Sequence, residues 1–178
     1  MTAKVSRRRL FAFVKNRDGA AAVEFAFVAL PLFWMIFGML EFGVLSLVQS
    51  TLDNAVSEVG REIRTGVAQA EGTTKAEMES RVCARMNEIM TLTCGGYLYL
   101  DVDRYDSFAD VGTGTPTNGG AMDLGQLGYT PGAANEVILV RAYYQWKIVT
   151  PFFAAIFANM ADGKRLVVSS MMFRNEPF

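Results

Sequence analysis

Hydrophobic residues form one long run near the start of the chain, from Ala20 to Val48. The charged side chains in this run are Glu24 and Glu41, and the sixteen residues between them, FAFVALPLFWMIFGML, are continuously apolar. A bilayer core about 30 Å thick needs about 20 helical residues, and the apolar residues on both sides extend the sixteen to that length. The pattern predicts a transmembrane helix over residues 20–48.

Beyond this run, apolar residues recur every three or four positions, with polar residues between them. This spacing is typical of an amphipathic helix with one buried face. Gly66 supplies a C-terminal stop, so the helix is expected to continue to about Thr65. Residues 49–66 are therefore predicted to extend the same helix. The predicted apolar stripe consists of Val44, Val48, Leu52, Val56, Val59, Ile63 and Val67.

Charge is distributed unevenly along the chain, which carries a net charge of −1 over 178 residues. Residues 1–18 hold six basic residues and one acid, a net charge of +5, which leaves −6 for the remainder. A basic segment beside an apolar helix stays on the cytoplasmic side, so the rest of the chain is expected outside. A secretory signal would end in small residues of A-x-A type, whereas this run ends in LEFGVLSLVQS. A buried core helix would leave the basic segment unexplained.

Residues 67–178 are predicted to form a small α+β domain outside the membrane. Thr73 or Thr74 can cap a helix, and Glu77 completes a capping box with Thr74. Strand candidates rich in β-branched and aromatic residues follow, and three strands with a helix predict an antiparallel sheet packed on the long helix. The helix presents Met78, Val82, Met86, Ile89 and Met90 on one face, and the strands are Tyr97–Tyr105, Glu136–Val149 and Arg165–Arg174.

Two segments of this domain lack a clear period. Residues 106–135 are rich in glycine and predict a long loop or a partly disordered excursion. The acids of this loop, Asp106, Asp110 and Asp123, lack the spacing of a calcium loop. The apolar segment Pro151–Met160 is too short to cross a bilayer as a helix. It is expected to form a core helix, or to lie against the outer membrane surface or another subunit.

The chain has two cysteines, Cys83 and Cys94, both on the predicted outer side. In an oxidising compartment the simplest interpretation is one disulfide that closes a short loop, and the alternative is two unpaired thiols. The chain has no histidine, which excludes catalysis by Ser-His or Cys-His pairs and metal binding by histidine. No metal and no cofactor are expected.

The two glutamates of the apolar run call for separate explanations. An ionised carboxylate at the edge of hydrocarbon costs at least about 2 kcal/mol unless it is paired, which makes Glu24 a candidate functional residue. The alternative is that Glu24 snorkels to the inner interface. Glu41 lies where the helix should emerge among the outer headgroups, so solvation alone accounts for it.

The residues RDG followed by AAAVEFAFVALP resemble the processing site of the type IV pilin class. In that resemblance Gly19 is the last leader residue, Ala20 the new N-terminus, Glu24 the fifth mature residue and Phe25 the aromatic residue after it. More closely, the chain resembles the TadE-like family, the minor pseudopilins of the tight-adherence (Tad or Flp) pilus system. The segments that carry this likeness are GAAAVEFAFVALPLF, QSTLDNAVSEVGREIRTG, VILVRAYYQWKIVTP and the terminal RNEPF.

The resemblance implies a non-catalytic pilus assembly protein in the bacterial inner membrane, with its C-terminal domain in the periplasm or incorporated in a pilus. Residues 1–19 would be a leader removed by a prepilin peptidase, a separate membrane aspartyl enzyme. The freed amine of Ala20 would pair with Glu24, as the pilin class pairs these groups between adjacent subunits. Other implied partners are pilins or pseudopilins, inner-membrane Tad assembly components and membrane lipid.

Two other functions follow from the residues without the resemblance. The second interpretation is a single-pass anchor for an extracytoplasmic binding module that takes no part in a pilus. A membrane-tethered enzyme has less support, because Ser169, Ser170, Lys147 and Lys164 form no recognisable catalytic motif. Nucleic acid is not an expected partner, since the outer domain is negatively charged.

Overall fold

The computed structural model describes residues 19–112 and 114–178, and the chain divides into two compact units between Leu40 and Glu41. The basic segment predicted as a leader, residues 1–18, lies outside the described residues. One helix, α2 (Ala20–Arg64), belongs to both units. It begins at the expected residue and ends one residue before the predicted Thr65.

The described part of the first unit is the start of α2. The helix runs through Pro31, although proline lacks the N–H that would bond to the carbonyl of Phe27. Its large apolar side chains are exposed, and the rings of Phe33 and Phe37 lie 6.5 Å apart between centroids. This stretch is long and apolar enough to cross a membrane, which agrees with the predicted membrane anchor.

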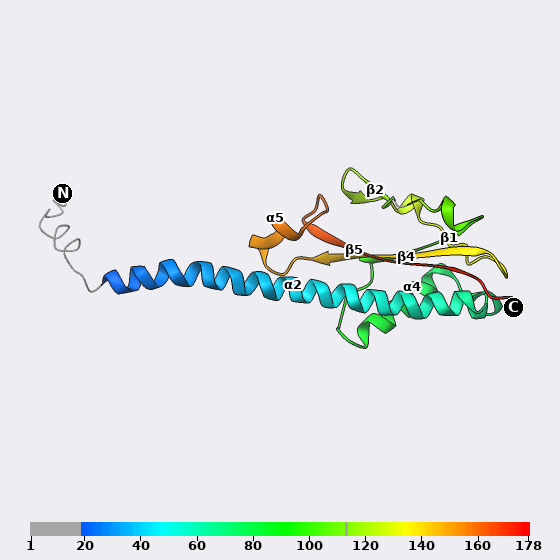
Figure 1. The fold of residues 1–178 in the computed structure, drawn as a ribbon, viewed down its shortest axis with the longest axis horizontal. Coiled ribbons are helices and arrows are strands. Elements are labelled where there is room, and N and C mark those ends of the chain that lie inside the picture. Colours follow the sequence, from blue (N-terminus) through cyan, green and yellow to red (C-terminus); the bar gives the residue numbers. More distant parts are fainter. Residues whose placement is uncertain (1–18, 113) are drawn as a thin grey trace, which may run out of the picture. The chain divides into compact units, whose positions relative to one another are not determined.

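The second unit, residues 41–178, is built on a three-stranded antiparallel sheet (Figure 1). Strand β4 (Val137–Lys147) is central, between β1 (Leu98–Tyr105) and β5 (Lys164–Arg174). Each strand overlaps one of the three predicted strands. The α+β prediction is therefore confirmed: a long apolar helix precedes a small domain with a helix and a three-stranded antiparallel sheet.

One face of the sheet packs on α2 and on α4 (Lys75–Asn87) in the main hydrophobic core. Alternate residues of each strand point into this core, as the two-residue period of a strand requires. Burying one Val or Leu side chain contributes about 1.5 to 3 kcal/mol, so the apolar stripe of α2 is a major source of stability. The stripe is buried at Val48, Leu52, Ala55, Val56, Val59 and Ile63, and the sheet contributes Leu98, Leu100, Val102, Ile138, Val140, Ala142, Tyr144, Val167 and Phe173.

A glycine sets how closely α2 approaches β5. Gly60 is buried, and a Cβ on it would lie 2.8 Å from Sδ of Met171 and 3.3 Å from Cε1 of Phe173. The first of these contacts is too short for carbon and sulfur atoms, so a larger residue would require either the Met171 side chain or the helix to shift. Gly60 therefore allows the side chains of Val56 and Ile63 to seat fully in the core.

The opposite face of the sheet is covered in part by the glycine-rich connection. A second apolar cluster forms there around Tyr143, Met160 and Leu166, joined by Met122 and Leu127 from the connection. The connection predicted as irregular contains two short strands that pair as a hairpin, and two 3-10 turns. These elements are η2 (Phe108–Asp110), β2 (Thr117–Asn118), β3 (Ala121–Met122) and η3 (Leu124–Gln126).

Helix α4 begins with the predicted capping box. The hydroxyl of Thr74 accepts from the backbone N–H of Glu77, and the Glu77 carboxylate accepts from the backbone N–H of Thr74. The hydrogen bonds that this carboxylate accepts from the backbone N–H and the hydroxyl of Thr74 lower the pKa of Glu77. Met78, Val82 and Met86 are buried as expected, but the placement of Ile89 on the apolar face was wrong. The helix ends at Asn87, so Ile89 leaves the helical face and is exposed.

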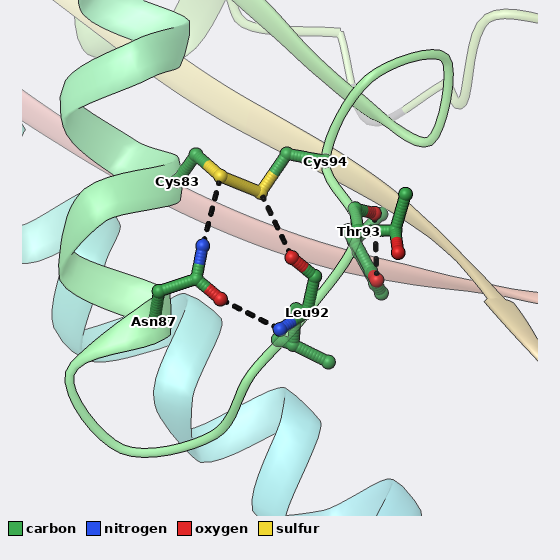
Figure 2. The surroundings of a disulfide bond; sticks show 6 residues. Cys83, Asn87, Leu92, Thr93 and Cys94 are labelled. Carbon is green, nitrogen blue, oxygen red and sulfur yellow. Dashed lines mark hydrogen bonds between the residues drawn. A yellow bond between two sulfur atoms is a disulfide. The ribbon is translucent and has the colours of Figure 1, made fainter.

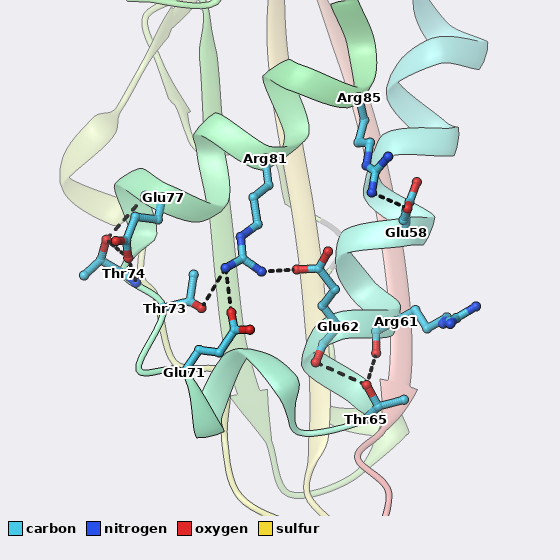
Figure 3. Close-up of polar contacts among 10 residues, drawn as sticks. All are labelled: Glu58, Arg61, Glu62, Thr65, Glu71, Thr73, Thr74, Glu77, Arg81 and Arg85. Atoms are coloured by element: carbon cyan, nitrogen blue, oxygen red, sulfur yellow. Dashed lines mark hydrogen bonds and ion pairs between the residues drawn. The ribbon is translucent and has the colours of Figure 1, made fainter. Parts of the chain in front are cut away.

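Ion pairs fix α4 against α2 (Figure 3). The guanidinium of Arg81 contacts Glu62 of α2 at 2.6 Å and Glu71 at 2.7 Å, and Arg85 contacts Glu58 at 2.7 Å. Glu71 follows the short helix α3 (Val67–Ala70). The hydrogen bonds to Glu71 and Glu62 raise the pKa of Arg81. Partly exposed pairs contribute about 0 to 1 kcal/mol each, so they orient α4 more than they stabilise it.

The last residues of the chain complete the end of α2. Gly66 ends the helix with a φ of 81°, and a side chain there would overlap the ring of Phe178. The backbone N–H of Glu176 donates to the carbonyl of Arg64 at 2.9 Å, and the two side chains form an ion pair at 3.2 Å. One of the carbonyls that a helix end leaves without an intrahelical partner is thereby satisfied. The terminal RNEPF therefore acts as a cap on α2.

The predicted disulfide between Cys83 and Cys94 is present (Figure 2). It ties the last turns of α4 to the segment that leads into β1. Asn87 supports the same turn, because its side-chain oxygen accepts from the backbone N–H of Leu92 at 2.6 Å and its amide donates to the sulfur of Cys83 at 3.2 Å. The bond closes the segment that carries the chain from the helix layer to the sheet.

Replacing both Cys83 and Cys94 by Ser is expected to lower the free energy of unfolding by about 2 to 3 kcal/mol. The reason is that the cross-link restricts a short loop in the unfolded chain. Urea unfolding of the detergent-solubilised full chain, followed by near-ultraviolet circular dichroism, measures this loss. A reductant should lower the free energy of unfolding of the wild type by the same amount and leave that of the double variant unchanged. An unchanged free energy of unfolding of the wild type in reductant would contradict the prediction.

Candidate functional site

The predicted cleavage residues lie at the N-terminus of α2. Gly19 immediately precedes the helix and Ala20 is its first residue, and both are exposed. A Cβ on Gly19 would meet nothing within 4 Å. The peptide bond between these residues is thus open to solvent in the chain as described.

The predicted assembly residues follow one turn later on the same helix. Glu24 is exposed, and the Phe25 side chain is 72% exposed. Because residues four apart share a helix face, with about 5 to 6 Å between their Cβ atoms, Ala20 and Glu24 lie one above the other. Within residues 19–112 and 114–178, Glu24 forms no hydrogen bond or ion pair. The structure thus brings three predicted residues, Gly19, Ala20 and Glu24, to one end of the helix.

Glu41 behaves differently, and the expectation that solvation accounts for it was wrong. Its side chain is 3% exposed. One carboxylate oxygen accepts from the backbone N–H of Val149 at 3.0 Å, and the other accepts from the backbone N–H of Thr150 at 2.9 Å. Hydrogen bonds to a charged acceptor are about twice as strong as neutral ones. We call this pair of bonds the Glu41 clamp.

The clamp holds the segment that follows β4 against α2. Thr150 precedes a 3-10 turn, η4 (Pro151–Phe153), which continues into α5 (Ala154–Phe157). Sequence reasoning missed the clamp because its donors are backbone groups more than a hundred positions away. The available signal was a charged residue in an otherwise apolar helix, which is costly to bury without partners.

Replacing Glu41 by Gln is expected to lower the free energy of unfolding by about 1 to 3 kcal/mol. Gln keeps the shape but has one acceptor oxygen, so one backbone N–H is left unsatisfied. Backbone hydrogen exchange of Val149 and Thr150 in the detergent-solubilised full chain should become faster. Glu58→Gln is the matched control on α2, since its partly exposed pair contributes at most about 1 kcal/mol. Equal effects of the two variants would contradict the clamp.

The most buried ion pair of the sheet serves the fold. Asp101 is 1% exposed and accepts from the guanidinium of Arg141 at 2.7 and 3.0 Å. Its other oxygen accepts from the backbone N–H of Gly128 at 2.8 Å, which holds the glycine-rich connection on β1. Burial, followed by the charge of Asp101, raises the pKa of the neighbouring Asp103, while Arg141 acts in the opposite direction.

The acids of the connection are dispersed. Asp110 accepts from the hydroxyl of Ser107, and Asp123 accepts from the backbone N–H of Gly125, so both stabilise local turns. Asp106 is an exposed partner of Arg104 at 3.5 Å. Across residues 19–112 and 114–178, no three Cys, Asp or Glu side chains are grouped to hold a metal ion.

A family model matches the part of the chain that holds Gly19, Ala20 and Glu24. Residues 19–61 match the TadE-like protein family. The match confirms the resemblance for GAAAVEFAFVALPLF and for most of QSTLDNAVSEVGREIRTG, whereas VILVRAYYQWKIVTP and RNEPF lie outside it. The TadE-like segment begins at the predicted last leader residue and ends three residues before the end of α2. It contains Glu24, Glu41 and most of the buried stripe, whereas the sheet lies outside it. Searches of curated proteins and of solved structures found no match.

Proposed function

We propose that this chain is a non-catalytic Tad pilus assembly protein, a minor pseudopilin processed between Gly19 and Ala20 by a prepilin peptidase. The observation that carries the proposal is the TadE-like segment, which begins at the proposed cleavage residue. The same segment holds a helix long and apolar enough to cross a membrane. In this proposal the chain is therefore a substrate of the peptidase and a subunit in pilus assembly.

The chemistry of the proposed site is a charge pair created by proteolysis. Cleavage would place a new α-amino group on Ala20, one helical turn from Glu24. Neither charge is tolerated singly in hydrocarbon, but an amine and a carboxylate together neutralise each other. The pair can form within one subunit or between neighbours, and the second arrangement links cleavage to assembly. Phe25 adds an exposed aromatic surface beside it.

The outer domain supports a structural role. Its buried charges, Asp101 and Arg141, bind each other and the glycine-rich connection. The partners proposed for it are other pseudopilins and inner-membrane Tad components. The proposed topology has residues 1–19 in the cytoplasm before cleavage and residues 67–178 in the periplasm, in accord with the positive-inside bias.

The mature chain is expected to begin at Ala20. Intact-mass and N-terminal measurements on the protein from cells with an active prepilin peptidase should show loss of residues 1–19. Protein from cells without the peptidase should keep Met1. Gly19→Leu should block cleavage, because glycine has no side chain and the bulky leucine side chain would not fit the peptidase subsite. Recovery of Met1 from cells with an active peptidase would contradict the proposal. It would favour a single-pass anchor for an extracytoplasmic binding module instead.

Replacing Glu24 by Ala is expected to leave membrane insertion and cleavage intact and to reduce piliation. The unpaired amine would cost about 2 to 3 kcal/mol in the assembled state, which corresponds to at least about a tenfold loss of incorporation. Counting pili and quantifying the subunit in sheared fibres measures this. Glu58→Ala is the control on α2 outside the apolar run. Normal piliation of the Glu24 variant would remove the pairing role.

A further inference from the structure

The apolar segment between β4 and β5 divides its side chains between the core and the surface. Residues 148–161, IVTPFFAAIFANMA, contain no charged residue. Ile148, Phe153 and Met160 are buried, as expected for the alternative in which the segment belongs to the core, although the α-helix in it is only Ala154–Phe157. Phe157 is half-buried against Phe153, whereas Val149 is 68% exposed and Phe152 is 83% exposed. Packing within the domain therefore explains the apolar side chains that are buried, but not the apolar side chains that are exposed.

The exposed half lies at a defined place along α2. The Glu41 clamp binds the backbone of Val149 and Thr150, so the segment sits beside the first residue after the continuously apolar stretch Phe25–Leu40. Figure 1 shows α5 at the end of the outer domain where α2 enters it. Phe42 of α2 is 62% exposed, and Ile156 of α5 is 57% exposed. We call Phe42, Val149, Phe152 and Ile156 the exit patch.

The charged residues that border the uncharged segment carry a net positive charge. Lys147 precedes it at the end of β4 and is exposed. Asp162 follows it and pairs with Lys164 at 2.6 Å, and Arg165, exposed at the start of β5, donates to the carbonyl of Phe157 at 3.2 Å. Apolar and aromatic side chains beside unneutralised cations suit the boundary between hydrocarbon and anionic headgroups.

We propose that the exit patch inserts into the outer headgroup layer of the same bilayer that α2 crosses. This inference rests on the proposed membrane anchoring of α2. Since the continuously apolar stretch Phe25–Leu40 ends just before Glu41, this residue and the segment clamped to it emerge at the level of the headgroups. A lipid surface fits better than a second protein. Specific protein interfaces bury about 800 Å² on each partner, and four partly exposed side chains supply only a fraction of that.

The test places a nitroxide on a cysteine introduced at Phe152 in the full chain. The native disulfide stays oxidised, and the protein is reconstituted singly in nanodiscs of phosphatidylcholine and phosphatidylglycerol, which leave both faces open. Collisions with oxygen, which concentrates in lipid, are compared with collisions with a water-soluble nickel chelate. Leu124→Cys is the matched control, since Leu124 is an exposed apolar residue of the same domain at 51%. Phe33→Cys reports on the proposed transmembrane stretch.

The expected result is an oxygen-to-nickel collision ratio at residue 152 several-fold higher than at 124 and below that at 33. A ratio at 152 equal to that at 124, with residue 33 in lipid, overturns the exit patch and leaves the anchor intact. Exposure of residue 33 to the nickel chelate overturns both. A second preparation holds two or more chains in each disc. Shielding of residue 152 from both reagents that is stronger in these discs than in discs with one chain identifies a protein partner and also overturns the proposal.

Discussion

A single continuous helix has to satisfy two different environments, and the rest of the structure depends on where it changes from one to the other. Up to Leu40, α2 is apolar and exposed on every side, which water does not tolerate over such a length. From Val48 onward it presents one apolar stripe, which the sheet and α4 cover. The Glu41 clamp lies between these two parts, where the outer domain first binds the helix.

In the outer domain, later parts of the chain return to α2 at both ends of the helical segment that packs on the domain, Glu41 to Arg64. At one end, the segment after β4 returns to Glu41. At the other, the backbone N–H of Glu176 binds the carbonyl of Arg64 and Phe178 covers Gly66. Between these points β5 is brought close by Gly60. Residues that are far from α2 in the sequence therefore contact the helix along its whole length in this domain.

The parts of the fold that depend on local patterns were predictable. The stripe from Val48 to Ile63, the capping box at Thr74 and the three strand segments are visible as periods and short motifs. The order β1-β4-β5 and the role of Gly60 were not predictable, because they depend on which distant residues meet. The hairpin at Thr117–Met122 was missed since its strands are too short to show alternation.

The candidate site shows the same division. Gly19, Ala20, Glu24 and Phe25 could be proposed from the sequence because their spacing relative to the basic segment and the apolar run is local, and their roles stay predictions. The function of Glu41 was missed, because its partners are backbone N–H groups that belong to no motif. Asp101 and Arg141 were likewise not singled out, since opposite charges 40 positions apart have no sequence signal.

The contrast between the two glutamates of the apolar run bears on the proposed function. Both carboxylates face the same cost if they are left without partners in a medium that solvates charge poorly. Glu41 meets this cost within the chain, through two backbone N–H groups. Glu24, in the part of the chain described by the structure, has neither a donor nor a cation beside it. Its compensation has to come from water at the interface or from a cation outside the described residues, and the proposed cleavage would supply one such cation, a new amine at Ala20 one helical turn away.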